Sequence, residues 1–184
     1  MHRRLALTIA SILLLAAAAL PQDSDNQNKA LDVQSSVGDL HVGADADAKK
    51  AGLPLYPGAR PKHDENADPL NFGILTESFG LKLVVAKYES DDGPDKVIAY
   101  YRNKLKKYGK VLECHSQKDG VDVQSDDKKS GESKELKCEQ NSGPVTELKV
   151  GTEDNQHIVA IEPRDSEGCT FSLVYLYSRK GDEL

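Results

Sequence analysis

One segment of this chain has the clear periodicity of an α-helix, and it limits the folds that the rest can form. It reads DDGPDKVIAYYRNKLKKYG over residues 91–109. Val97, Tyr101, Leu105 and Tyr108 recur at the spacing of one helix face, and Pro94 suits the first helical turn. We therefore predict one amphipathic helix over about 94–108 that packs this stripe against another element, most simply a sheet.

The other apolar runs are short and favour strands. Residues 71–90 alternate in hydrophobicity and indicate two strands joined near Gly80, or one long strand with a bulge. Two short strands, VLECHS and KELKCEQ, flank a long polar loop. Three more strands are expected as a meander over 145–150, 157–163 and 169–179. The last of these is apolar on both faces, so we expect it to be central.

Strands before and after a single helix indicate an α+β domain. We predict one antiparallel β-sheet of about five to seven strands, ending in a C-terminal meander, with the helix packed across it. The predicted division is a signal peptide over 1–19, a flexible polar tail over 20–52 and a single domain over 53–184. The tail prediction rests on apolar residues too scattered to offset the entropy cost of ordering. Within it, ADADAKKAG is compatible with a short helical turn, but we expect a mobile linker.

A proline-rich stretch, GLPLYPGARP, stands between the tail and the first strands. Pro54 and Pro57 match a P-x-x-P docking motif, but so short a match occurs often by chance. A ligand loop is a further alternative. We interpret the stretch as the start of the folded domain, since its prolines stiffen the chain and Pro57-Gly58 favours a turn.

The first twenty residues are typical of a secretory leader. A basic MHRR precedes the uncharged apolar run 5–20, and alanines at 17–19 suit cleavage after Ala19. Later apolar runs are too short to cross a bilayer. We predict an exported bacterial protein, periplasmic or extracellular, without stable membrane insertion after leader cleavage; an uncleaved leader acting as an anchor is the alternative. The final GDEL resembles an ER-retention signal, and we interpret it as a chance match.

The charge of the chain limits its partners. Its formal net charge is −6 at pH 7, and cleavage of the leader would remove Arg3 and Arg4 as well. An acidic protein is a poor sequence-independent binder of nucleic acid, because that binding depends on neutralising phosphates. We therefore expect a protein or small-molecule partner, with no nucleic acid and no cofactor.

Three cysteines are present, and export favours a disulfide between two of them. Cys114 and Cys138 lie symmetrically about the polar loop, so a hairpin would place them opposite each other at a Cα separation of about 5.5 Å. Such a bond would contribute about 3 kcal/mol. Cys169 is expected to be a small buried residue, and a pair that includes Cys169 remains the alternative.

The chain lacks the common sequence motifs of metal, nucleotide and hydrolase sites, so we predict no catalytic and no metal residues. His115 follows Cys114, but neighbours on a strand point to opposite faces. The acidic stretch HDENAD is interpreted as a solvated loop. Tyr56, Arg60 and His63 form a possible binding surface. The seven tyrosines suit either the edge of the core or a binding face, and we favour the core edge.

Two of these segments together resemble small exported bacterial domains that open on a YPGA segment. The matching residues are Tyr56 to Ala59, followed by a helix of the form V-x-x-Y-Y-x-x-x-L-x-x-x-G, which Val97, Tyr100, Tyr101, Leu105 and Gly109 nearly match. The resemblance covers about 53–113. It implies an exported compartment and a similar architecture, and it implies no catalytic residues.

These observations favour a soluble exported protein that acts as a non-enzymatic binding or envelope-interaction module. The alternative is a hydrolase-like enzyme with a dispersed site of carboxylates and tyrosines on the sheet face. An enzyme would need a concave pocket with converging titratable groups, so the structure bears on this choice.

Overall fold

The computed structural model describes residues 30–62, 69–117, 135–138, 141–164 and 167–180. Several predictions lie outside these residues: the signal peptide, the start of the tail, the HDENAD loop with His63, and the GDEL ending.

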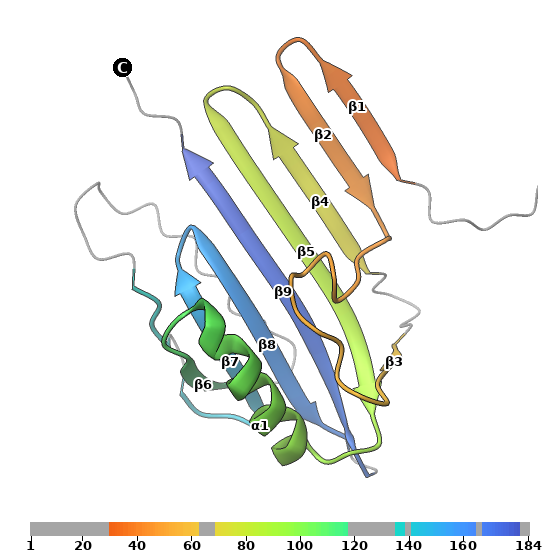
Figure 1. Cartoon of the computed structure of the whole chain (residues 1–184), viewed down its shortest axis with the longest axis vertical. Coiled ribbons are helices and arrows are strands. Elements are labelled where there is room, and N and C mark those ends of the chain that lie inside the picture. Colours follow the sequence, from red (N-terminus) through yellow and green to blue (C-terminus); the bar gives the residue numbers. More distant parts are fainter. Residues whose placement is uncertain (1–29, 63–68, 118–134, 139–140, 165–166, 181–184) are drawn as a thin grey trace, which may run out of the picture.

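The described residues form one antiparallel sheet of nine strands with a helix across one face (Figure 1). The order across the sheet is β1-β2-β4-β5-β9-β8-β7-β6, and the short β3 pairs with β5. The strands are β1 (Leu31–Ser35), β2 (Gly38–Gly43), β3 (Arg60–Pro61), β4 (Leu70–Leu75), β5 (Phe79–Ser90), β6 (Leu112–Ser116), β7 (Val145–Thr152), β8 (Asn155–Pro163) and β9 (Cys169–Lys180). The α+β class is confirmed, but the predicted five to seven strands are too few.

The predicted helix is confirmed as α1 (Pro94–Leu105), continued by the 3-10 turn η1 (Lys106–Tyr108). Gly93 is the N-cap and Pro94 occupies the first turn, as the sequence indicates. Val97, Tyr101 and Leu105 are fully buried because the helix lies over β7 and β8. We call the face of the sheet that carries α1 the front face.

The C-terminal meander β7-β8-β9 is confirmed, and β9 is central because it lies between β8 and β5. Residues 70–90 form two strands, β4 and β5, joined by a turn at 76–78 close to Gly80, as the first of the two alternatives predicts. The front face of β5, β7, β8 and β9 supplies most of the core. Its buried side chains include Val84, Ala86, Leu148, Val159, Ile161, Phe171 and Leu173.

Part of the predicted tail is built into the fold, and the sheet begins at Leu31 rather than at residue 53. β1 and β2 form a hairpin that joins β4. Residues 44–59, which we call the strap, then cross the front face beside the helix (Figure 1). We expected a mobile linker here, but a helical turn is present over 47–53, and it buries Ala48 and Ala51. The prediction of a flexible tail was wrong for this segment, because its alanines have low hydrophobicity and yet fit tightly against the sheet.

Tyrosine hydroxyls hold the strap in place. The Tyr101 hydroxyl accepts a hydrogen bond from the Tyr56 N–H at 3.1 Å and donates to the Pro54 carbonyl at 3.2 Å. Three further bonds join a tyrosine hydroxyl to the strap backbone: Tyr88 with Ala48 N–H, Tyr100 with Leu55 C=O, and Tyr108 with Gly52 C=O. The favoured interpretation of these four tyrosines, as residues at the edge of the core, agrees with this arrangement.

The Cys114–Cys138 disulfide is confirmed, with a Cα separation of 5.5 Å, and Cys169 is a buried free thiol. The predicted hairpin around it is wrong. β6 pairs with β7, so Cys114 lies opposite Glu147. In the expected strand at 134–140, the described residues make only an isolated bridge, from Glu135 to Thr152. The disulfide joins two segments that are not strand partners, since the strand partner of β6 is β7.

The hydroxyl of Tyr101 should stabilise the fold more than the hydroxyl of its neighbour Tyr100. Tyr101→Phe removes two hydrogen bonds from a fully buried ring, and we expect it to lower the free energy of unfolding by about 1–3 kcal/mol. The matched change Tyr100→Phe removes one bond at a half-buried ring and should cost about 0.5–1 kcal/mol. Urea unfolding measures both. Equal losses would contradict the proposed role of Tyr101.

The cysteine pairing can be mapped on the oxidised protein. We expect non-reducing peptide mapping to show the Cys114 and Cys138 peptides joined. Cys169 should react with iodoacetamide only after unfolding, because burial excludes the reagent and raises the pKa of its thiol to about 11. A linked peptide that contains Cys169 would contradict this pairing.

Candidate ligand-binding site

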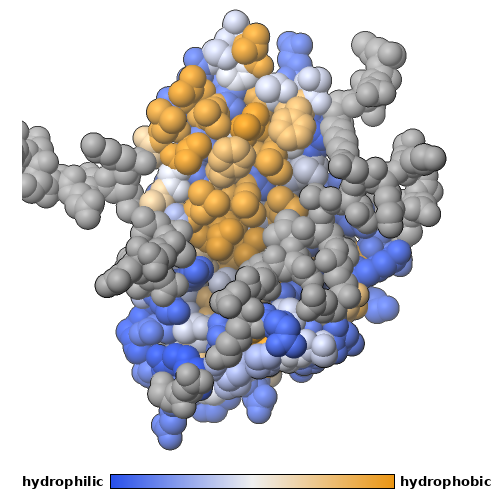
Figure 2. All heavy atoms as spheres, turned by 180° about the vertical axis from the view of Figure 1, so that it is seen from behind, coloured by the Kyte–Doolittle hydropathy of each residue, from blue (hydrophilic) through white to orange (hydrophobic). Residues whose placement is uncertain are grey.

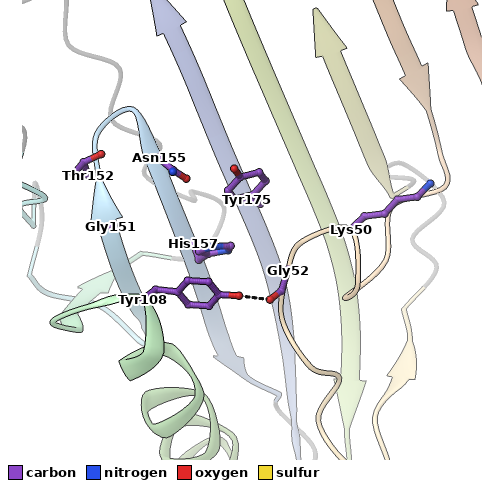
Figure 3. Close-up of a pocket in the computed structure, with 8 residues that line it drawn as sticks. All are labelled: Lys50, Gly52, Tyr108, Gly151, Thr152, Asn155, His157 and Tyr175. Atoms are coloured by element: carbon purple, nitrogen blue, oxygen red, sulfur yellow. Dashed lines mark hydrogen bonds between the residues drawn. The ribbon is translucent and has the colours of Figure 1, made fainter. Parts of the chain in front are cut away.

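A cavity of about 530 Å³ opens on the front face between the strap, the end of the helical segment and the strands β7, β8 and β9 (Figure 3). Tyr108 comes from η1, His157 from β8 and Tyr175 from β9. The full lining is Lys50, Gly52, Tyr108, Gly151, Thr152, Asn155, His157 and Tyr175. Chain segments far apart in the sequence therefore converge on one hollow.

His157 is the central side chain of this cavity. It pairs with Tyr175 in the β8–β9 register, so both side chains point to the front face. The His157 ring lies 4.8 Å from the Tyr175 ring and 4.0 Å from the Tyr108 ring, between centroids. Figure 3 shows the imidazole flanked by the two phenol rings. Only 9% of His157 is exposed.

The strap determines which imidazole nitrogen carries the proton. His157 Nδ1 lies 3.0 Å from the Ala51 carbonyl oxygen, which can only accept a hydrogen bond. Burial lowers the pKa of His157, so the ring is neutral at pH 7. A neutral ring that donates from Nδ1 has an unprotonated Nε2. That nitrogen has no hydrogen-bond partner among the described residues, so it can accept a hydrogen bond from a ligand.

Gly52 allows the strap to approach this ring. Its φ of 74° is in the left-handed region that favours glycine. A Cβ at this position would lie 3.0 Å from His157 Cε1. The Gly52 carbonyl also accepts the hydrogen bond from the Tyr108 hydroxyl that Figure 3 marks. A larger residue at 52 would push the strap away from His157.

The charge of the cavity differs from that of the whole chain. Although the chain carries a net charge of −6, none of the described residues that line the cavity is a carboxylate. Lys50 lines it, where it is paired with Asp45. Lys107 Nζ lies 4.5 Å from the centre of the Tyr108 ring, and Lys82 Nζ lies 5.7 Å from that of Tyr175. The walls therefore favour a neutral or anionic ligand over a cation.

The residues of the predicted binding surface lie elsewhere. Tyr56 is buried, with its ring edge-on to Tyr100 at 5.1 Å and its hydroxyl donating to Asp92 at 2.8 Å. Arg60 lies in β3, and His63 is outside the described residues. Neither Tyr56 nor Arg60 lines the cavity.

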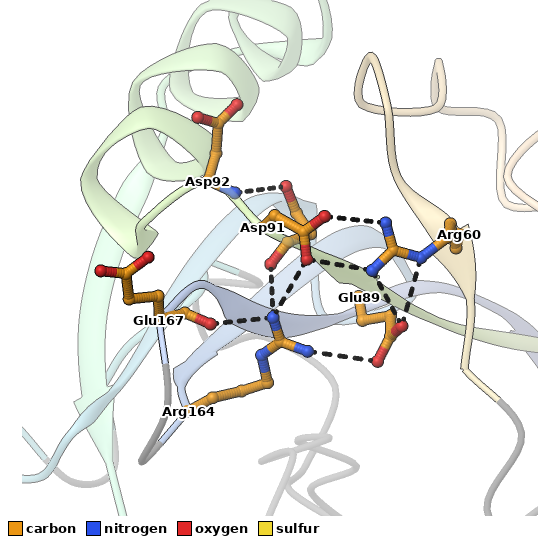
Figure 4. Close-up of polar contacts among 7 residues, drawn as sticks. Arg60, Glu89, Asp91, Asp92, Arg164 and Glu167 are labelled. Carbon is orange, nitrogen blue, oxygen red and sulfur yellow. Dashed lines mark hydrogen bonds and ion pairs between the residues drawn. The ribbon is translucent and has the colours of Figure 1, made fainter.

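Arg60 belongs to an ion-pair network with Glu89, Asp91 and Arg164 (Figure 4). Its guanidinium donates to Asp91 at 2.9 and 3.0 Å and to Glu89 at 3.2 and 3.4 Å. Arg164 reaches the same two carboxylates and the Glu167 carbonyl oxygen. Hydrogen bonding to Arg60 lowers the pKa of Asp91 to about 2. The network joins β3, β5 and the turn before β9, so the engaged groups suit a structural role.

Sequence reasoning did not single out His157, Tyr108 or Tyr175 as site residues. The alternation in β8 shows that His157 shares a face with Asn155. The partners of that face depend on the pairing of β8 with β9 and on where η1 and the strap lie. These contacts are tertiary and have no local sequence signal.

The pH dependence of stability tests the neutral state of His157. The unfolded chain takes up a proton below about pH 6.5 that the folded protein resists, so acid shifts the equilibrium toward unfolding. From about pH 7 to about pH 5, the free energy of unfolding should fall more steeply in the wild type than in His157→Gln. Asp91 contributes in a separate window, between about pH 4 and about pH 2. Parallel profiles above about pH 5 would contradict the assignment.

Among the described residues, no group of three or more His, Cys, Asp or Glu side chains is placed to hold a metal ion. The helix that the structure describes is too short and too polar to cross a bilayer. Comparison with protein-family models, with curated proteins and with solved structures found no match.

Proposed function

We propose that this protein is an exported binding module whose front-face cavity takes a small planar ligand, neutral or anionic. One observation carries the proposal: a neutral imidazole with an available Nε2 lies against two tyrosine rings, in a cavity without lining carboxylates. The cavity volume, about 530 Å³, falls in the range of small-molecule sites.

The lining groups suggest how such a ligand would be held. Tyr108 and Tyr175 offer apolar ring surface to a planar group. His157 Nε2 would accept a hydrogen bond from a ligand hydroxyl or N–H group. Lys107 would attract a carboxylate through longer-range electrostatics, whereas Lys50 is already paired with Asp45. A planar ring with a hydroxyl donor at one end and an anion at the other combines these features.

Binding is better supported than the alternative of a hydrolase-like enzyme. That alternative requires carboxylates beside the tyrosines, and the described lining of the cavity contains none. The Tyr108 hydroxyl already donates its proton to the Gly52 carbonyl oxygen. The cavity offers recognition groups without the paired carboxylates of general acid and base chemistry.

Calorimetric titration with 4-hydroxybenzoate, benzoate and 4-hydroxybenzamide tests the proposal. We expect 4-hydroxybenzoate to bind best, because benzoate lacks the hydroxyl donor and the amide lacks the charge. His157→Gln should weaken its binding about tenfold, the equivalent of losing one good hydrogen bond. His115→Gln is the matched control, since His115 lies on β6 outside the cavity lining, and it should bind like the wild type.

Two results would contradict this function. One is that none of the three planar compounds binds. The other is that His157→Gln and His115→Gln bind 4-hydroxybenzoate equally well, which would place the binding site away from the cavity.

A further inference from the structure

The two outer edges of the sheet differ in how they are protected. At the β6 edge, the Cys114–Cys138 disulfide holds residues 135–138. Asn141 makes an isolated β-bridge with His115, and its side-chain Oδ1 accepts a hydrogen bond from the His115 backbone N–H at 3.2 Å. β1 is at the opposite edge and pairs only with β2. Among the described residues, none pairs with its outer side. Within the described part of the chain, β1 therefore presents open backbone groups on this side, which can pair with another strand.

The hairpin geometry identifies these open groups. β1 and β2 are joined by a two-residue turn at 36–37, and Ser35 pairs with Gly38 across it. The residues that flank such a turn form a hydrogen-bonded pair, and pairs along the ladder then alternate. Ser35, Val33 and Leu31 direct their backbone groups toward β2. Asp32 and Gln34 direct their N–H and C=O groups outward.

β1 is short and carries Asp32, but it lacks the other common devices that prevent edge pairing. Its sequence, LDVQS, contains no Pro and no Lys, and its ladder with β2 runs without a bulge. Leu31 and Val33 are 56% and 46% exposed. Both lie on the back face of the sheet, opposite the helix, where Figure 2 shows a gathering of apolar side chains. The register places these residues there: Leu31, Val33, Leu40, Val42, Phe72, Ile74, Leu81, Leu83 and Val85.

We propose that a second copy of the chain occupies this edge, with the two β1 strands antiparallel about a two-fold axis at Val33. Asp32 of each copy then lies opposite Gln34 of the other. Both residues point their backbone groups outward, so the two pairs can each exchange two hydrogen bonds. Val33 meets Val33 as a non-hydrogen-bonded pair, in which side chains are closest.

Charge favours this register and makes the strand suitable for self-pairing. A shift that placed Asp32 opposite Asp32 would bring like charges together, whereas the proposed register places each carboxylate opposite an amide. Asp32 is the only charged residue of β1, and its carboxylate already accepts a hydrogen bond from His41 Nδ1 at 2.6 Å. Two chains that are each acidic overall can therefore meet at this edge without placing like charges directly opposite each other. The apolar back faces become continuous across Val33.

Sedimentation velocity over a range of protein concentrations tests the proposal, independently of any cavity ligand. We expect the wild type to form a dimer. Gln34→Pro removes an outward N–H from each copy but spares the β1–β2 bonds, so it should weaken dimerisation about tenfold or more. Gln34→Thr keeps the N–H and suits a strand, so it is the matched control and should dimerise like the wild type.

A third variant distinguishes edge pairing from stacking of the apolar faces. Ile74→Asp places a charge on the back face of β4, away from the edge, and should leave an edge-paired dimer intact. Amide hydrogen exchange should also show Asp32 and Gln34 becoming protected as the protein concentration rises. A monomer at all concentrations would overturn the proposal. So would a dimer that is lost in Ile74→Asp but kept in Gln34→Pro.

Discussion

The hydrogen bonds between tyrosine hydroxyls and the strap are the interactions on which the rest of the front face depends. The strap crosses the sheet without joining a ladder, so its peptide groups need other partners. Tyr88, Tyr100, Tyr101 and Tyr108 supply them at Ala48, Leu55, Pro54, Tyr56 and Gly52. A tyrosine can bury its ring in the core and still reach a backbone group with its hydroxyl. Phenylalanine would fill the same space and leave these five backbone groups without a hydroxyl partner.

The same docking forms the cavity, so fold and candidate site share their support. The Ala51 carbonyl selects the tautomer of His157, and the adjacent Gly52 carbonyl is held by Tyr108. Both carbonyls lie near the end of the helical turn of the strap. If the strap moved away, the His157 Nδ1–H group would lose the Ala51 carbonyl oxygen as its hydrogen-bond acceptor. The proton could then lie on either ring nitrogen, and Nε2 would no longer be fixed as the unprotonated one. The ligand recognition that we propose therefore depends on a segment without strand or α-helix.

The sequence allowed the helix, the meander and the disulfide to be predicted, because each has a local or symmetric signal. Val97, Tyr101 and Leu105 repeat at helical spacing, and the last three strands are dense in apolar residues. The strap was missed because Ala48 and Ala51 contribute little hydrophobicity, although their small size allows close packing. The cavity was missed because His157 meets its aromatic neighbours only through strand register and helix placement. The predicted disulfide pairing was correct, but the hairpin from which it was argued is absent, since the two segments are not strand partners.

The disulfide also connects the compartment of the protein to the protection of its sheet. An open antiparallel sheet has two edges, and each must be covered or paired to avoid uncontrolled association. At the β6 edge the chain uses a covalent bond, and that bond persists only where thiols oxidise. In a reducing compartment, residues 135–138 would lose this tether and β6 would be less protected. We propose an exported location from the leader. In such a location the disulfide can protect the β6 edge, while the β1 edge stays available for the pairing that we propose.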